Sequence, residues 1–129
     1  MIVADTSALV AVVLGEPDAE RYLARIEDEE TTVSAVSLVE ARIVVEARQG
    51  PDATRDLGLL VEGAVGRVVP VDAEHADAAF GAWRRFGKGR HPAGLNLGDC
   101  FAYAAARLAG VPLLFKGDDF TLTDVASAL

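Results

Sequence analysis

Short apolar runs that alternate with longer amphipathic stretches constrain this chain more than any other feature. Runs rich in β-branched residues predict strands, and stretches with apolar side chains every three or four residues predict helices. The predicted strands cover residues 2–4, 31–34, 67–71 and 111–115, with a possible fifth near Val125. The predicted helices cover residues 7–14, 18–29, 36–48, 51–62, 73–86 and 97–109. This order implies a parallel sheet covered by helices on both faces, so we expect a three-layer α/β/α domain with four to five strands.

Size and composition favour one domain over residues 1–129. The chain is long enough to bury a core, and 51% apolar with 25% charged residues is typical of globular proteins. No apolar run is long enough to span a membrane, and no basic leader precedes the first apolar run, so we expect neither membrane contact nor a secretory signal. Cys100 is the only cysteine, which excludes an internal disulfide and fits a reducing cytoplasm. His75 and His91 are the only histidines, which excludes a standard structural zinc site.

The charges of the chain are unevenly distributed. Twelve basic and twenty acidic residues give a net charge of −8, which argues against non-specific binding to nucleic acid. Four of the basic residues nevertheless fall within seven positions, and they are Arg84, Arg85, Lys88 and Arg90. This basic strip either contacts phosphate groups or is a solvated helix end, and the sequence leaves both interpretations open.

Acidic residues follow two of the predicted strands. Asp5 comes directly after the first strand, and Asp118 and Asp119 come after the fourth. Ligands bind beyond the carboxyl ends of strands in open parallel sheets, so these acids share one crevice if the two strands are neighbours. A local alternative exists for Asp5, because Asp5, Thr6 or Ser7 can cap the helix that follows.

Two further carboxylates lie on predicted helices that are otherwise apolar. Glu40 interrupts the apolar face of its helix, where a carboxylate costs free energy unless it is paired or bound to a cation. Arg42 or Arg67 could neutralise it. Asp99 is near the start of a helix that is apolar almost all round. It is either a ligand to a bound group or simply an acid placed favourably at a helix N-terminus.

Taken together, these acids predict a metal site. Two carboxylates about 4 Å apart repel each other by roughly 4 kcal/mol at an effective dielectric constant near 20, so a cluster takes up protons or binds a cation. Oxygen ligands favour hard ions, which here means Mg²⁺ or Mn²⁺. Such a site can activate a water molecule and neutralise charge on a phosphoryl group, which suggests hydrolysis of phosphodiester bonds.

The same residues carry a resemblance to a known family. The segments IVADTSALVAVV at the start, LNLGDCFAYAAA near the end and LLFKGDDF after it, together with Glu40, resemble PIN-domain nucleases. Within that group the chain is similar to the VapC-type ribonuclease toxins, in consistent order from residue 2 to Asp124. The resemblance implies a PIN-like fold and a Mg²⁺- or Mn²⁺-dependent endoribonuclease. It also implies a homodimer that is held inactive by a cognate VapB-type antitoxin.

The resemblance assigns roles to individual residues. It places metal ligation and catalysis at Asp5, Glu40, Asp99 and Asp118, with the adjacent Asp119 as the alternative fourth acid. Asp5 is then a ligand, while Thr6 or Ser7 caps the helix and supports the site, and Asn96 orients ligands or caps its own helix. The residues expected to contact RNA are Arg84, Arg85, Lys88, Arg90 and Lys116. For Lys116, balancing nearby acids is the alternative.

Apolar residues outside the acidic motifs give two further expectations. Trp83 continues a stripe with Ala76, Ala79 and Phe80, so we expect it to pack in the core rather than to stack on a base. We expect Cys100 to be a small core residue. The helices at residues 7–14 and 36–45 are more apolar than one buried face requires, so part of their surface is expected to meet the homodimer partner or the antitoxin.

Other classes of protein fit the sequence less well. A phosphatase would carry a second Asp two residues after Asp5, where this chain has Ser7. A phospho-receiver domain would need an acceptor Asp after its third strand, for which Asp72 is only a loose candidate. No glycine-rich turn follows the first strand, which argues against a dinucleotide-binding domain. A PIN-like domain that only binds its partners is the alternative that is not an enzyme, although all the expected acids are present.

Overall fold

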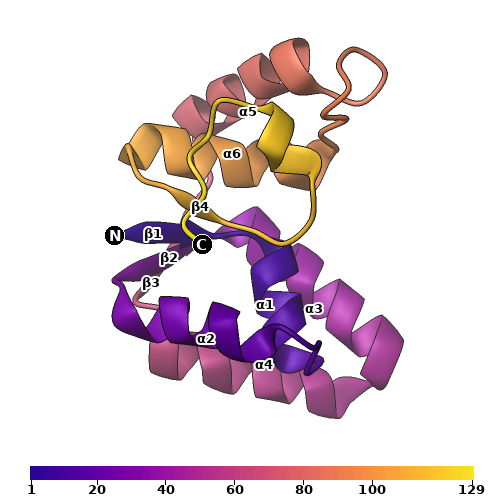
Figure 1. Cartoon of the computed structure of the whole chain (residues 1–129), viewed down its shortest axis with the longest axis vertical. Helices are drawn as coiled ribbons and strands as arrows, with labels where there is room; N and C mark the ends of the chain where they lie inside the picture. The colour runs from indigo at the N-terminus through magenta and orange to yellow at the C-terminus, as the bar shows by residue number, and fades with distance from the viewer.

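Four short parallel strands form the centre of the structure, a computed structural model that describes residues 1–129 (Figure 1). The strands are β1 (Ile2–Ala4), β2 (Thr31–Ser34), β3 (Arg67–Val69) and β4 (Leu113–Leu114). Their spatial order is β3-β2-β1-β4, and β1 pairs with both β2 and β4. The first and last strands are therefore neighbours, which brings the acids that follow them to the same edge of the sheet. The possible fifth strand is reduced to an isolated bridge between Leu113 and Ser127.

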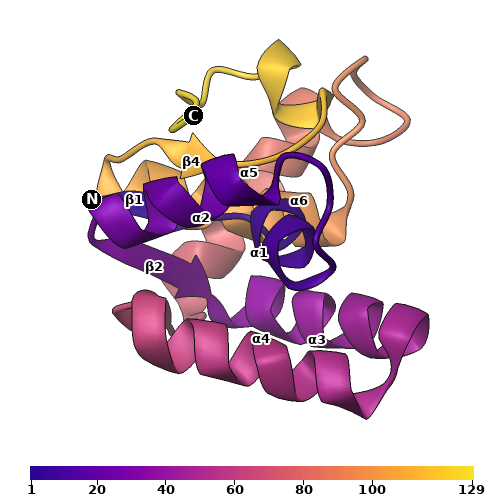
Figure 2. The same cartoon turned by 60° about the horizontal axis from the view of Figure 1, so that its bottom comes forward.

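Helices cover both faces of this sheet, which confirms the expected three-layer arrangement (Figures 1 and 2). Four helices lie on one face and two on the other. The predicted helices and strands are all present, and their bounds differ from the expected ones by at most two residues at each end. The helices are α1 (Thr6–Val13), α2 (Ala19–Asp28), α3 (Ala35–Gln49), α4 (Pro51–Ala64), α5 (Ala73–Phe86) and α6 (Leu97–Ala109), followed by a short 3-10 helix, η1 (Asp119–Leu122).

Each face of the sheet has its own hydrophobic core, because successive side chains of a strand point to opposite faces. Ile2 and Ala4 of β1 pack into the core beneath α1–α4. Val3 packs into the core beneath α5 and α6. The chain reverses between α3 and α4 at Gly50, whose φ of 82° favours glycine, and Pro51 then occupies the first turn of α4. β1, β2 and β4 are buried throughout because helices cover both faces of the sheet.

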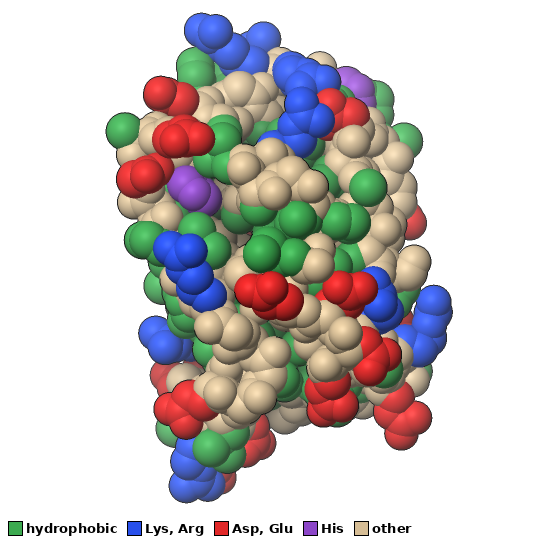
Figure 3. All heavy atoms as spheres, turned by 90° about the vertical axis from the view of Figure 1, so that its left-hand side faces the viewer, with side chains coloured by type: hydrophobic (Ala, Val, Ile, Leu, Met, Phe, Trp, Pro, Cys, Tyr) green, Lys and Arg blue, Asp and Glu red, His purple; other side chains and the backbone are tan.

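The two edges of the sheet differ in character. The carboxyl ends of the strands lead into α1 and α3 and into the loop after β4, and this edge carries the acids predicted from the sequence. Figure 3 shows the other edge, where the chain begins, and there acidic and basic side chains are interspersed around hydrophobic ones. No helix is long and apolar enough to cross a membrane.

Candidate active site

Asp5 serves two purposes with its two carboxylate oxygens. It is the N-cap of α1, and its Oδ2 accepts hydrogen bonds from the backbone N–H of Ser7 at 3.0 Å and from the Ser7 hydroxyl at 2.7 Å. The side chain is buried, with 4% of its surface exposed, and Oδ1 has no partner. Burial raises the pKa of Asp5. The expectation that Thr6 or Ser7 caps the helix is therefore wrong, because Asp5 caps it and still has a free buried oxygen.

The two residues after Asp5 support the carboxylate by tying α1 to its surroundings. The Ser7 hydroxyl, while donating to Asp5, accepts a hydrogen bond from the backbone N–H of Lys116 at 2.9 Å. The Thr6 hydroxyl donates to the backbone carbonyl of Ser37, at the start of α3. These contacts connect α1 to the end of β4 and to α3. They hold the Asp5 side chain in one orientation.

Glu40 reaches the same region from α3. Its carboxylate lies against Gly98 in the first turn of α6, so closely that a Cβ atom at position 98 would overlap it. No ion pair involves Glu40, so the alternative that Arg42 or Arg67 neutralises it is excluded. The position of Glu40 at the N-terminus of α6 explains how the chain tolerates it, because the positive end of the helix dipole partly offsets the charge.

Asp99 is fixed by the cap of its own helix. The Asn96 side chain accepts a hydrogen bond from the Asp99 backbone N–H at 2.9 Å, and Asp99 Oδ2 accepts one from the Asn96 backbone N–H at 3.1 Å. This reciprocal capping box bears out the expectation that Asn96 caps its helix. Burial raises the pKa of Asp99 to about 6, and the charges of Asp5, Asp119 and Glu40 add to the increase. Asp99 is therefore a carboxylate held where its charged form is unfavourable.

The three acids Asp5, Glu40 and Asp99 line one pocket of 360 Å³, which we call the acidic pocket. The other residues that line it are Thr6, Ser7, Val10, Glu16, Val44, Arg48 and Lys116. The sequence prediction missed Glu16 and Arg48. A signal for Arg48 was present, because Glu40, Val44 and Arg48 are spaced four residues apart and so share one face of α3.

The fourth predicted acid does not join this group. Asp118 is exposed beyond β4 and does not line the acidic pocket. Asp119 is exposed as well, but its charge contributes to the raised pKa of Asp99. Neither residue lines the acidic pocket, and of the two it is Asp119 whose charge raises the pKa of Asp99.

Lys116 balances acids at the rim of the acidic pocket. Its ammonium group donates to Glu16 at 2.6 Å and to Asp18 at 2.8 Å, and these bonds raise the pKa of Lys116. The same bond from Lys116 lowers the pKa of Asp18. Of the two roles expected for Lys116, the structure therefore shows the pairing with nearby acids.

The basic strip divides into one paired residue and three unpaired ones. Arg85 forms an ion pair with Asp124 at 2.9 Å, and the Tyr103 hydroxyl also donates to Asp124, so these groups fasten the C-terminal segment to α5 and α6. Arg84, Lys88 and Arg90 form no ion pair with a carboxylate. Three of the four residues are therefore available to a ligand.

Trp83 does not lie in the core, contrary to expectation. It is 37% exposed, and its neighbour Phe80 is 52% exposed. Ala79, on the same stripe, is buried, whereas Ala76 is exposed. The side chains of this stripe line a second pocket, between α5 and α6, instead of packing in the core. Cys100 is buried as expected, and burial raises the pKa of its thiol to about 11.

The donor set of the acidic pocket fits a hard cation. Four carboxylates line the pocket, and one of them, Glu16, is engaged by Lys116. Asp5, Glu40 and Asp99 remain, and the buried Oδ1 of Asp5 has no partner. The side chains as they stand are not close enough for any three of them to hold one ion. A bound cation would have to draw them together, as expected for carboxylates that repel one another in its absence. Asp5, Glu40 and Asp99 are thus the residues that can ligate a metal.

Fold and site together define a class of protein. It is a three-layer α/β domain in which three carboxylates meet in a pocket at the carboxyl edge of a parallel sheet. The sequence model of the PIN domain matches residues 2–126, and the chain belongs to the PIN-domain family.

Several proteins of known name are similar to this chain over nearly its whole length. It is 53% identical over 127 residues to ribonuclease VapC of Mycolicibacterium smegmatis, and the alignment covers 98% of both chains. It is 51% identical to ribonuclease VapC30 of Mycobacterium tuberculosis, covering 98% of this chain and 97% of that one. The resemblance to VapC-type proteins expected from the motifs is confirmed.

Two crystal structures share the fold at low sequence identity. Mycobacterium tuberculosis VapC20, described as a sarcin-ricin loop cleaving toxin, superposes with a TM-score of 0.79 at 20% identity over 98% of this chain and 97% of that one. FitAcB from Neisseria gonorrhoeae superposes with a TM-score of 0.67 at 21% identity, covering 98% of this chain and 96% of that one. The expected PIN-like fold is confirmed.

Proposed function

We propose that this protein is a metal-dependent endoribonuclease toxin of a toxin–antitoxin pair that acts in the cytoplasm. The observation that carries the proposal is the convergence of Asp5, Glu40 and Asp99 on one pocket in a chain 51–53% identical to VapC ribonucleases. An acidic pocket would repel the phosphate groups of RNA unless a cation neutralised it. A metal ion held by the carboxylates would remove this repulsion at the phosphate that is cut.

Asp5, Glu40 and Asp99 would hold the ion, and Asp119 would add negative charge near Asp99. When bound, Mg²⁺ or Mn²⁺ supplies an activated water molecule and neutralises charge that develops on the phosphoryl group. Asp5 would contribute the oxygen that has no partner in the chain, while its other oxygen stays on the cap of α1. The Ser7 hydroxyl would keep the Asp5 carboxylate oriented, and the backbone N–H of Asn96 would do the same for the Asp99 carboxylate.

Arg84, Lys88 and Arg90 would bind the phosphate groups of RNA on either side of the bond that is cut. They form no ion pairs within the chain, whereas Arg85 is held by Asp124. Because phosphate contacts fix the position of the backbone without reading its sequence, these residues would hold the substrate over the acidic pocket. Their contribution should weaken as salt concentration rises.

Partner proteins would restrain this activity. We propose a VapB-type antitoxin that places a basic side chain in the acidic pocket, most favourably an Arg that donates two hydrogen bonds to carboxylates. We also propose a homodimer, and exposed apolar residues of α3, Val39 and Ile43, support an interface there. The α1 part of the expected interface is not supported, since Ala8, Leu9 and most other apolar residues of α1 are wholly or largely buried.

The direct test is cleavage of RNA by the purified protein without its partner. We expect cleavage with Mg²⁺ or Mn²⁺, none in excess EDTA, and products with 5′-phosphate and 3′-hydroxyl ends, because attack by water needs no 2′-hydroxyl. Ends that carry 2′,3′-cyclic phosphate, or cleavage that persists in EDTA, would contradict the metal mechanism. Expression of the protein alone should arrest growth, and co-expression of the antitoxin should relieve the arrest.

A further inference from the structure

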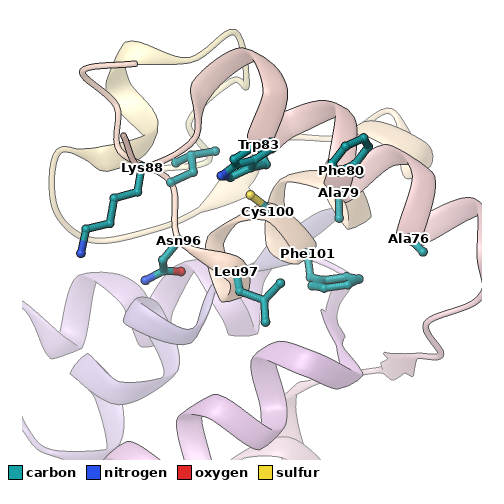
Figure 4. A pocket seen from close by; sticks show the side chains of 10 residues that line it. Ala76, Ala79, Phe80, Trp83, Lys88, Asn96, Leu97, Cys100 and Phe101 are labelled. Atoms are coloured by element: carbon teal, nitrogen blue, oxygen red, sulfur yellow. The ribbon is translucent and has the colours of Figure 1, made fainter. Parts of the chain in front are cut away.

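A second pocket lies between α5 and the first turns of α6, beside the acidic pocket. Its volume is 590 Å³, within the range of small-molecule sites. We call it the aromatic pocket, because Phe80 and Trp83 of α5 form one wall and Leu97 and Phe101 of α6 form the other (Figure 4). Its remaining lining residues are Ala76, Ala79, Lys88, Leu95, Asn96 and Cys100.

The aromatic side chains of this pocket are arranged as a stacking surface. The rings of Phe80 and Trp83 lie with centroids 5.8 Å apart and planes inclined by 18°. The guanidinium of Arg84 lies over the Phe80 ring at 4.6 Å, and that of Arg90 lies over the Trp83 ring at 4.8 Å. Aromatic rings flanked by guanidinium groups form the surface on which proteins stack unpaired bases.

The polar groups of the aromatic pocket gather at one end. Lys88 and Asn96 extend to the same side of the pocket, away from Ala76 (Figure 4). The oxygen of the Asn96 side chain is used in the cap of α6, so its amide N–H groups are free to donate. This combination of apolar walls and a few donors at one end suits a flat, hydrogen-bonding ring.

The charge around the aromatic pocket also suits RNA. Arg84, Lys88 and Arg90 have no carboxylate partners, although the protein as a whole has a net charge of −8. A ligand that carries both an aromatic ring and a phosphate would therefore satisfy the walls and the rim of the pocket together. The pocket is also in the right place, since Asn96 is three residues before Asp99 of the acidic pocket.

We propose that the aromatic pocket is a subsite for one unpaired nucleobase of the RNA, next to the phosphate that is cut. This inference rests on the proposed ribonuclease function and adds a substrate feature to it. The base would stack against Phe80 and Trp83, and Lys88 and Asn96 would donate hydrogen bonds to its edge or to the neighbouring phosphate. The protein would then cut RNA beside a nucleotide that is single-stranded or turned out of a helix.

A second copy of the chain is a less suitable occupant. In a symmetric dimer centred on this pocket, the same surface would face itself. Arg84, Lys88 and Arg90 would then oppose their own copies with no carboxylate among the lining residues to neutralise them. Like charges opposed at an interface cost binding free energy. The dimer proposed above is centred on α3, whose apolar surface adjoins this pocket at Asn96 and Leu97, so the test below also measures a second copy as the occupant.

Fluorescence of Trp83 tests the proposal directly, because Trp83 is the only tryptophan in the chain. A single-stranded RNA of five nucleotides is titrated into the full-length protein in EDTA, and an abasic oligomer of the same length and charge is titrated as the comparison. We expect the RNA to quench Trp83 emission and to bind roughly tenfold more tightly than the abasic oligomer, because stacking depends on the base. Phe80→Ala should weaken binding of the RNA by a similar factor. Leu59→Ala, at another exposed apolar position on α4, should bind like the wild type.

Three results would overturn the proposal. The first is equal binding of the RNA and the abasic oligomer, and the second is unchanged RNA affinity in Phe80→Ala. The third is Trp83 emission that changes with protein concentration when no RNA is present, because the pocket would then be covered by a second copy. Cleavage of RNA with Mg²⁺ by the same preparation is measured separately. If cleavage persists while base-dependent binding fails, the subsite is wrong and the proposed function stands, whereas loss of both overturns both.

Discussion

The acidic pocket and the aromatic pocket lie side by side at the start of α6, and they differ in the kind of side chain that is buried or exposed. The acidic pocket takes Asp99 from this turn, and the aromatic pocket takes Asn96, Leu97 and Cys100. In the acidic pocket, polar groups are buried: Asp5 has a free buried oxygen, and burial raises the pKa of both Asp5 and Asp99. In the aromatic pocket, apolar groups are exposed, and Leu97 is 76% exposed.

The two pockets nevertheless share one energetic property. Each pocket puts side chains where they cost free energy in the isolated protein, and each would gain that energy back from a ligand of the matching kind. A cation would relieve the acidic pocket, and a flat aromatic group would cover the other. Substitutions in the acidic pocket should therefore change chemistry with little loss of stability, and substitutions in the aromatic pocket should change affinity.

The largest expected effect comes from Asp5→Asn. The Asn side chain can still accept the bond from Ser7 that caps α1, so the fold should persist. Cleavage of RNA should fall by about a thousandfold or more, because an active-site metal supplies several kcal/mol of transition-state stabilisation. Initial cleavage rates in saturating Mg²⁺ measure the change. Asp56→Asn, at an exposed position on α4, is the matched control and should cut at the wild-type rate. Near-normal activity in folded Asp5→Asn would remove Asp5 from the metal site.

A smaller loss is expected from Gly98→Ala. The new Cβ would overlap the Glu40 carboxylate, so Glu40 would have to move away from the first turn of α6. We expect roughly 10- to 100-fold weaker metal binding or slower cleavage, which is typical when the surroundings of a metal ligand are disturbed. Calorimetric titration with Mn²⁺ measures the affinity. Gly81→Ala on α5 has no atom within 4 Å of its new Cβ and should match the wild type. If both variants behaved alike, Glu40 would not need its present position.

The smallest effect is a shift in thermal stability with pH. The pKa of Asp99 is about 6 in the folded protein, above its ordinary value of 3.8, so the folded state takes up a proton more readily than the unfolded state. The metal-free protein should therefore become more stable as pH falls from about 7 to about 5, and less stable as pH rises. In Asp99→Asn this contribution should vanish, which changes the pH dependence of Tm by a few degrees. If Tm in EDTA changed with pH in the same way for both proteins, burial of the Asp99 charge would be contradicted.

Local signals in the sequence predicted much of this molecule. The bounds of α6 and its cap were predictable, because Asn96, Asp99 and Gly110 are standard terminal residues for a helix. The adjacency of β1 and β4 was only a condition of the sequence argument, because local patterns do not define the order of strands in a parallel sheet. The free oxygen of Asp5 was not predictable, because it depends on how Ser7 bonds to both Asp5 and the end of β4.

The features that the sequence did not define depend on tertiary packing. Periodicity predicts which residues of a helix lie on the same face, but not whether another element covers that face, and Trp83 is exposed for this reason. The sequence also left open whether an Arg neutralises Glu40, because its contact with Gly98 is created only by the packing of α3 on α6. The choice between Asp118 and Asp119 depends on the turn after β4, which the sequence pattern does not define.

The thermal stability of the protein as a function of Mg²⁺ concentration tests the central claim most directly. The claim is that Asp5, Glu40 and Asp99 form a cation site whose carboxylates repel one another when it is empty. It predicts that wild-type Tm rises with added Mg²⁺, that Asp5→Asn is at least as stable as the wild type in EDTA, and that Mg²⁺ raises the Tm of Asp5→Asn much less. A wild-type Tm that neither Mg²⁺ nor Mn²⁺ changes at millimolar concentration would contradict the claim.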